Sequence, residues 1–310
     1  MNFVGIDIGG TNVKLAVVNG KGEIVKKSSI KTFGTRDAAH VIADISDEVL
    51  RLTEGLKYEA IGVGCPGAID SENGIVEYSP NLFWKNVALA KGISDRTGKP
   101  VKLSNDANVA ALGEAKFGAG KNYTDTAFLT LGTGLGGGFV INGKLFEGFH
   151  SMGTEIGHTV IRENGVQCAC GRKGCFEVYA SATALIRETL HTMYANKNSM
   201  MWEHCEKDLN KVDGRTAFAC AKKGDWAAKE VVDNFIRSLA EGILNVIAVF
   251  RSQAVILGGG VCGEGAYLTD PVQAYVDEHR YGGKNSLRTV ILTAKLGNSA
   301  GVIGAASLVM

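Results

Sequence analysis

The sequence predicts an α/β fold built from two similar halves. Each half opens with a buried strand, a glycine-rich loop and a second strand: FVGIDI leads into GGT near the N-terminus, and the strand at 126–133 leads into LGTGLGGG. Segments with helical spacing of apolar residues alternate with further strands through the rest of each half. These observations predict a duplicated α/β fold with a cleft between two lobes, 1–118 plus 298–310 and 119–297.

The first half begins with three short strands joined by tight turns at GGTN and NGKGE, which predicts an antiparallel meander. The next stretch, 36–55, has apolar residues at helical spacing. A loop is expected at 78–81. The strands expected in this half are 3–8, 13–18, 23–31, 60–70 and 101–106, and the helices are 36–55, 87–97 and 107–117.

The second half repeats this theme and adds a hairpin turn at Asn142-Gly143. The segment 196–214 is the best candidate for a mobile or lineage-specific insertion. The strands expected here are 126–133, 139–142, 144–146, 254–261 and 289–296, and the helices are 179–194, 214–223, 226–250, 271–279 and 299–309.

Composition excludes several classes of protein. The chain has 310 residues, with 33 basic and 32 acidic side chains and a net charge of +1, so nothing favours a nucleic-acid partner or a membrane surface. No apolar run approaches the roughly 20 residues of a membrane helix. The N-terminus lacks the basic region of a signal peptide, so we expect a cytoplasmic protein.

Three cysteines and one histidine lie close together in sequence. Cys168, Cys170 and Cys175 follow His158, and three thiolates with one imidazole suit a closed, structural tetrahedral zinc site. The alternative is a loop of buried or paired cysteines, which a reducing compartment disfavours. Glu155 and Glu177 are each near a ligand, so the metal would restrict two acceptor side chains suited to a polyol.

Glycine-rich loops end three predicted strands: DIGGTNVK from Asp7 to Lys14, LGTGLGGG from Leu131 to Gly138, and GGG from Gly258. Such loops can aim backbone N–H groups at phosphates, and Asp7 at a strand end can hold a magnesium ion. No P-loop or dinucleotide fingerprint is present, and a single Gly-Gly-Thr is often only a hairpin turn. Together, the loops predict a nucleotide cleft.

Asp106 is the candidate acid for proton transfer. It follows Asn105 at the end of a predicted strand and precedes a helix, which places it at a cleft edge. Phosphoryl transfer needs a carboxylate to accept the hydroxyl proton. The alternative is that Asp106 is simply the N-cap of the helix, and both roles are compatible.

These motifs together resemble the ROK family (repressors, open reading frames, kinases) of the actin-like, hexokinase-related superfamily. The resemblance covers nearly the whole chain and is most specific at GTEIGH joined to CACGRKGCFEVYAS; DIGGTNVK, PGAID, PN, SNDAN, LGTGLGGG and GGGV match further family motifs. It implies a two-lobed actin-like (ribonuclease H-like) ATPase fold with a duplicated βββαβα core. It also implies ATP, Mg²⁺ and structural Zn²⁺ as cofactors.

The resemblance implies a role for each matching residue. Asp106 would be the general base, and His158 would touch both metal and sugar through its two ring nitrogens. The implied sugar-binding residues are Gly67, Asn81, Asn105, Asp106, Glu155, His158 and Glu177. The implied nucleotide-side residues are Asp7, Gly9, Gly10, Thr11, Lys14, Thr133, Gly134, Gly258 and Gly259. The implied zinc ligands are His158, Cys168, Cys170 and Cys175.

The resemblance implies an ATP-dependent hexose kinase, with glucose phosphorylated at its 6-OH as the expected reaction. Fructose, mannose, allose and N-acetylmannosamine remain alternative substrates. The family also contains repressors with a helix-turn-helix ahead of the first phosphate motif. Because Asp7 already lies in that motif, we do not expect a repressor. A non-catalytic sugar-binding protein remains a less favoured alternative, since Asp7, Asp106 and all the glycine loops are intact. A homodimer or homotetramer is expected.

Overall fold

The computed structural model describes residues 1–32 and 37–310, and the chain divides into two compact units. The first comprises 1–128, 137–154 and 294–310, and the second comprises 129–136 and 155–293. Compared with the lobes expected from the sequence, the first unit also holds 119–128, 137–154 and 294–297. The start of the helix expected over 36–55 falls on Arg36, outside the described residues.

The first unit contains a five-stranded sheet in the order β3-β2-β1-β4-β8. The meander of β1 (Asn2–Ile8), β2 (Asn12–Asn19) and β3 (Ile24–Lys31) is antiparallel, which confirms the prediction. β4 (Ile61–Cys65) and β8 (Val101–Asn105) run parallel to β1, with Asp7 paired to Gly64 and Cys65 to Asn105. The carboxyl ends of these three strands therefore meet at one edge of the sheet.

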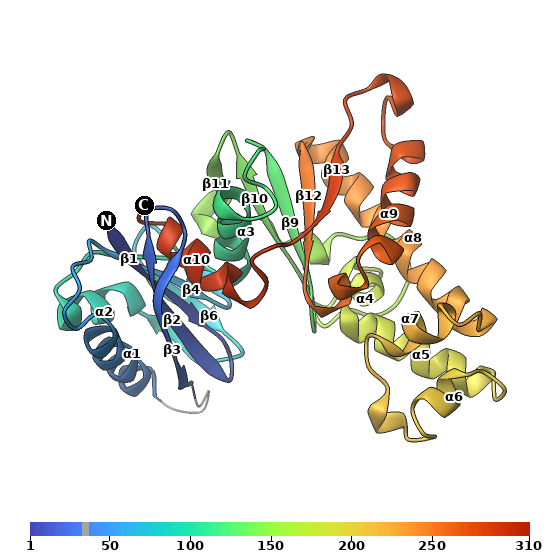
Figure 1. Cartoon of the computed structure of the whole chain (residues 1–310), viewed down its shortest axis with the longest axis horizontal. Coiled ribbons are helices and arrows are strands. Elements are labelled where there is room, and N and C mark those ends of the chain that lie inside the picture. Colours follow the sequence, from blue (N-terminus) through green and yellow to red (C-terminus); the bar gives the residue numbers. More distant parts are fainter. Residues whose placement is uncertain (33–36) are drawn as a thin grey trace. The chain divides into compact units, whose positions relative to one another are not determined.

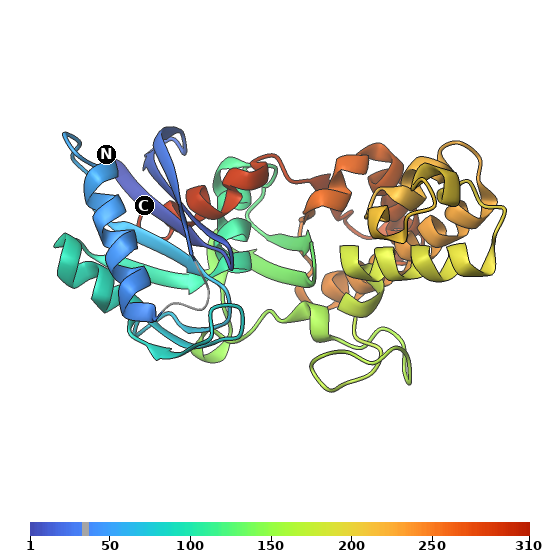
Figure 2. The same ribbon diagram turned by 90° about the horizontal axis from the view of Figure 1, so that it is seen from below.

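Helices cover both faces of this sheet. α1 (Ala38–Leu52) and α2 (Leu89–Thr97) pack on one face against residues such as Val4 and Ile6. α10 (Ala300–Ser307) packs on the other face against Phe3, and α3 (Asp106–Phe117) packs against α10. Figures 1 and 2 show α1 and α10 on opposite sides of the sheet.

Two glycines let α10 approach the sheet backbone closely. A Cβ on Gly5 would lie 1.8 Å from the Val302 carbonyl oxygen, and one on Gly62 would lie 1.7 Å from the Ala305 oxygen. Neither backbone oxygen can move aside cheaply, so only glycine fits at these two strand positions.

A small sheet of β5 (Ala68–Asp70), β6 (Ile75–Ser79) and β7 (Trp84–Val87) completes the first unit. The single strand expected over 60–70 is wrong: it breaks at Pro66-Gly67, because Pro66 lacks an N–H and Gly67 has a φ of 119°. The loop expected at 78–81 is also wrong at its start, since Tyr78 and Ser79 pair with β7.

The second sheet has the order β11-β10-β9-β12-β13. Its strands are β9 (Thr126–Leu131), β10 (Leu135–Ile141), β11 (Lys144–Phe146), β12 (Ala254–Gly258) and β13 (Val290–Thr293). The glycine-rich turn is shorter than expected, because residues from Leu135 onward already form β10.

The helices of the second unit are α4 (Glu177–Ala180), α5 (Ala182–Ala195), α6 (Met201–His204), α7 (Thr216–Ala221), α8 (Trp226–Phe250) and α9 (Ala266–His279). The single helix expected over 179–194 is interrupted at Ser181, whose hydroxyl caps α5. α9 begins upstream of its expected start and contains Pro271. Short 3-10 turns are η1 (Phe149–Ser151), η2 (Ile156–His158), η3 (Leu209–Lys211), η4 (Gly260–Glu264), η5 (Gly283–Asn285) and η6 (Gly297–Ser299).

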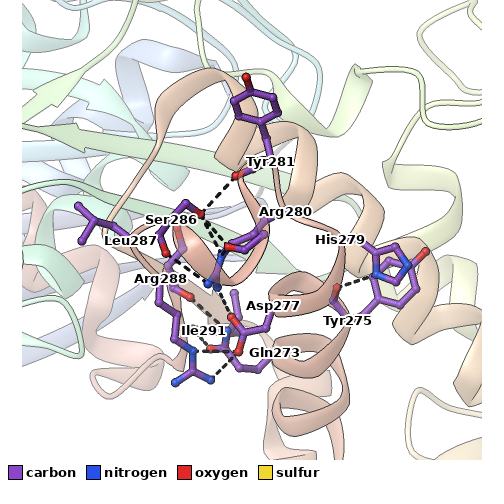
Figure 3. Close-up of polar contacts among 12 residues, drawn as sticks. Gln273, Tyr275, Asp277, His279, Arg280, Tyr281, Ser286, Leu287, Arg288 and Ile291 are labelled. Atoms are coloured by element: carbon purple, nitrogen blue, oxygen red, sulfur yellow. Dashed lines mark hydrogen bonds and ion pairs between the residues drawn. The ribbon is translucent and has the colours of Figure 1, made fainter.

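The segment after α9 is held by a polar network (Figure 3). The buried Arg280 pairs with Asp277 and donates to the Gly283 carbonyl at 3.1 Å, and Arg288 pairs with the other Asp277 oxygen at 2.7 Å. Tyr281 and Leu287 are exposed on this braced segment. None of the described helices is long and apolar enough to cross a membrane.

Candidate functional site

The four predicted zinc ligands come together in the second unit. Their ligand atoms all lie within 4.8 Å of one another, with Cys168 Sγ 3.7 Å from His158 Nδ1 and Cys170 Sγ 3.6 Å from Cys175 Sγ. A tetrahedral zinc with Zn–S bonds of about 2.3 Å places its sulfur ligands about 3.8 Å apart. The donor set and its spacing therefore fit this metal.

A compact hairpin builds this cluster. Val160 pairs with Cys175, and the Cys168 N–H donates to the Arg172 carbonyl at 2.8 Å. Gly174 has a φ of 81°, and a Cβ there would lie 1.7 Å from the Arg162 carbonyl oxygen, so the turn requires glycine. The local chain therefore sets the ligand geometry.

The thiols of the cluster differ in their surroundings. Cys168 and Cys175 are buried, while Cys170 is exposed. Hydrogen bonding from the Arg172 backbone lowers the pKa of Cys170, and burial raises the pKa of Cys175 to about 12. A zinc ion at this position would supply the positive charge that a buried thiolate needs.

The two glutamates near the cluster occupy different environments. Glu155 is exposed at the start of η2, and its carbonyl accepts from the His158 N–H at 3.1 Å. Glu177 is the first residue of α4, two positions after Cys175, and its Oε2 accepts from the Leu135 N–H at 3.0 Å. The hairpin at 160–175 therefore leads directly into a residue that contacts the second glycine loop.

The glycine loops of the second unit pack against each other. Within 131–135, the Gly132 N–H donates to the Gly134 carbonyl at 3.0 Å and the Thr133 side chain is exposed. Gly258 ends β12, and Gly259 has a φ of 98°. A Cβ on Gly259 would lie 2.3 Å from the Leu131 carbonyl oxygen. The predicted phosphate and adenosine loops of this unit are thus neighbours.

In the first unit, Asp7 and Lys14 face each other across the first glycine loop. They are paired on β1 and β2, and Lys14 Nζ lies 3.7 Å from Asp7 Oδ2. Burial raises the pKa of Asp7, although Lys14 opposes the shift. Gly301 makes room for this carboxyl, since a Cβ there would lie 2.5 Å from it.

The loop that follows Asp7 is a tight turn with an exposed tip. The Gly9 N–H donates to the Asn12 carbonyl at 2.9 Å, and Gly10 and Thr11 are exposed. Asn81 is exposed in the loop after β6, and its carbonyl oxygen would lie 3.9 Å from a Cβ on Gly10. The first phosphate motif and one predicted sugar residue therefore lie near each other.

Asp106 is the first residue of α3, and the cap belongs to its neighbour. Asn105 Oδ1 accepts from the Ala107 N–H at 2.8 Å, while Asn105 Nδ2 donates to the Gly67 carbonyl at 3.2 Å. The interpretation of Asp106 as the N-cap is therefore wrong. Its half-buried carboxylate lies in the first helical turn, where the helix dipole favours negative charge.

Tertiary structure brings Asp7 and Asp106 to the same edge of the sheet, around a thiol that the sequence did not single out. Cys65 is buried at the end of β4, and burial together with the charges of Asp106 and Asp7 raises its pKa. The remaining cysteines outside the zinc set, Cys205, Cys220 and Cys262, are buried too.

The predicted site residues fall into two sets, one in each unit. The first unit holds Asp7, Gly9, Gly10, Thr11, Lys14, Gly67, Asn81, Asn105 and Asp106. The second unit holds Thr133, Gly134, Glu155, His158, Cys168, Cys170, Cys175, Glu177, Gly258 and Gly259.

Comparison with known proteins assigns the family. The model of the ROK family matches residues 3–310. The chain belongs to the ROK family. It is 37% identical over 310 residues to the glucokinase of Thermotoga maritima, covering 100% of this chain and 97% of that protein. It is also 29% identical over 311 residues to the xylose repressor of Bacillus subtilis, covering 99% of this chain and 76% of the repressor.

A solved ROK structure supports the same assignment. The crystal structure of a ROK family glucokinase from Streptomyces griseus in complex with glucose and AMPPNP matches with a TM-score of 0.83 and 34% identity, covering 99% of each chain. The resemblance to ROK kinases and the two-lobed actin-like α/β fold expected from it are therefore confirmed.

Proposed function

We propose that this ROK protein is an ATP-dependent glucokinase that transfers the γ-phosphoryl group of ATP to the 6-OH of glucose. The observation that carries the proposal is Asp106, which is held at the first turn of α3 with Asn105 anchored to Gly67 beside it. The identity to a bacterial glucokinase over the full chain supports glucose as the sugar.

Asp106 is assigned the proton transfer. Its carboxylate accepts the proton of the sugar hydroxyl as that oxygen attacks the γ-phosphorus, and the leaving group is ADP. Its position at a helix N-terminus favours the ionised carboxylate that this role requires. Backbone partners hold both the oxygen and the nitrogen of the Asn105 amide. The side chain therefore keeps one orientation, in which it positions the sugar in this proposal.

The remaining predicted residues bind and orient the substrates in this proposal. Asn81, Glu155, His158 and Glu177 bond other sugar hydroxyls, and a site that does so rejects epimers because its own polar groups are left unpaired. The loop N–H groups at Gly10, Thr11, Thr133 and Gly134 bind phosphates, and Gly258 and Gly259 lie along the adenosine.

Two metals belong to the proposal. Asp7 and its neighbours would hold Mg²⁺, which offsets negative charge on the phosphate oxygens. His158, Cys168, Cys170 and Cys175 would hold a structural Zn²⁺. Ligation through His158 Nδ1, the nitrogen that faces Cys168, leaves Nε2 for a sugar hydroxyl. Zinc would thereby fix the orientation of a sugar-binding ring.

A panel of hexoses tests the substrate. Purified protein is assayed by coupled ADP release with ATP and magnesium on glucose, fructose, mannose, allose and N-acetylmannosamine. We expect the highest kcat/KM with glucose. If another hexose gives a kcat/KM about tenfold above that of glucose, that hexose replaces glucose as the proposed substrate. The assignment as a kinase would stand, because a tenfold preference is only about 1.4 kcal/mol of discrimination between sugars.

The second candidate function is a sugar-responsive regulator, and the similarity to a xylose repressor favours it. Absence of turnover with every hexose, together with measurable sugar binding, would favour it. A cytoplasmic location and a homodimer or homotetramer remain predictions. Size-exclusion chromatography with light scattering tests the oligomeric state.

A further inference from the structure

The second glycine loop, 131–135, is held at both of its ends by the segment that follows the hairpin at 160–175. At the start of the loop, the Gly132 carbonyl accepts from the Ala182 N–H at 2.8 Å. At its end, the Leu135 N–H donates to Glu177 Oε2 at 3.0 Å. Glu177 and Ala182 begin α4 and α5, so a six-residue stretch contacts the loop at two points.

The packing around Glu177 leaves little freedom for this contact. A Cβ on Gly134 would lie 2.4 Å from Glu177 Oε2, so the carboxylate rests directly on the loop backbone. A Cβ on Gly157 would lie 2.1 Å from the Leu135 carbonyl oxygen, so η2 also packs on the end of the loop. The predicted zinc ligand Cys175 lies two residues before Glu177, so metal ligation would also restrict the start of α4.

We propose that Glu177 is a positioning residue for the nucleotide phosphates: it holds the Leu135 N–H, and through it the conformation of Thr133 and Gly134. This inference deepens the proposed function and rests on it for the binding of nucleotide phosphates by Thr133 and Gly134. One carboxylate oxygen fixes the phosphate loop, and the second stays available for a sugar hydroxyl. Nucleotide affinity thereby depends on a residue otherwise assigned to the sugar.

Glu155 supplies a matched control. It is assigned to the sugar like Glu177, but it is exposed and has no hydrogen bond to the loop 131–135. The Glu177→Ala change removes the acceptor, whereas Glu177→Gln keeps a carbonyl oxygen that can accept the Leu135 N–H. The Glu155→Ala change alters the sugar side alone.

The experiment measures the Kd of AMPPNP with magnesium by calorimetry in the absence of sugar, with the zinc content of each variant determined. We expect Glu177→Ala to weaken binding about tenfold, the order expected when a hydrogen bond to a charged acceptor no longer orders the loop. Glu177→Gln and Glu155→Ala should stay within about twofold of the wild type. Equal losses in Glu177→Ala and Glu155→Ala, or no loss in Glu177→Ala, would overturn the proposal.

Hydrogen exchange gives an independent test in the unmodified protein. The Leu135 amide should exchange slowly in the wild type and faster in Glu177→Ala. If it exchanges in the wild type at the rate of an unstructured amide, the proposal is wrong even if no Glu177 variant folds. Because both measurements omit sugar, failure to phosphorylate glucose would overturn the proposed function without touching this inference.

Discussion

Glu114 offers a test of how the first unit is held together. Its side chain is fully buried in α3, and its carboxylate accepts four hydrogen bonds from three backbone N–H groups. These come from Ala119 at 2.8 Å, from Lys295 at 2.9 and 3.1 Å, and from Leu296 at 2.7 Å. One carboxylate therefore anchors the chain after α3 and the segment before α10.

The cost of Glu114→Ala follows from these contacts. Three donors lose their acceptor, at about 1–3 kcal/mol each when no other partner replaces it. Because Lys295 is exposed, water can reach some of these donors. We therefore expect the free energy of unfolding to fall by about 3–5 kcal/mol, near the lower end of the summed range. Glu114→Gln keeps one acceptor oxygen but turns an NH₂ group toward a backbone donor, so the free energy of unfolding should fall by about 1–3 kcal/mol.

Thermal unfolding followed by circular dichroism measures the effect. For a domain of this size, about 2–4 °C is lost per kcal/mol, so Glu114→Ala should melt about 10 °C below the wild type. Glu230→Ala, which removes an exposed glutamate from α8, is the control and should stay within about 0.5 kcal/mol. Equal melting temperatures for Glu114→Ala and Glu230→Ala would refute the reasoning.

Three further predictions concern the proposed site. Metal analysis should find about one zinc per chain, and Cys170→Ser should lose zinc and glucose affinity together; folded, active protein without metal would contradict this. Asp106→Asn should retain glucose and ATP binding but lose about 10²–10⁴ in kcat, and a near-normal kcat would remove Asp106 as the base. Burial raises the pKa of Asp7, so the folded chain holds this proton more tightly than the unfolded chain and stability falls as pH rises above the ordinary value of 3.8. The melting temperature of Asp7→Asn should therefore rise relative to that of the wild type as the pH increases above 3.8, while turnover falls about 10²-fold. A pH-independent difference in melting temperature would contradict the assignment.

Features that depend on local sequence were predicted well. The meander of β1 to β3, the helices α1, α2 and α8, and the hairpin that collects His158, Cys168, Cys170 and Cys175 all depend on periodicity, turns or short spacing. Errors arose where one residue decides the outcome: Pro66-Gly67 splits a strand, Ser181 splits a helix, and Asn105 rather than Asp106 caps α3. A pattern averaged over several residues does not resolve such positions.

The sequence by itself determined the family motifs, the glycine loops and a ligand set suited to zinc, because each is a short stretch whose chemistry its own residues specify. Only the tertiary structure decided that Asp7 and Asp106 share one edge of a sheet around Cys65, that Glu177 contacts the Leu135 N–H, and that Glu114 anchors two distant segments. The hydrogen bond of Glu177 joins residues 42 positions apart, and that of Glu114 to Leu296 joins residues 182 positions apart. Strand pairing and helix packing create them, and residue spacing along the chain carries no signal of such pairings.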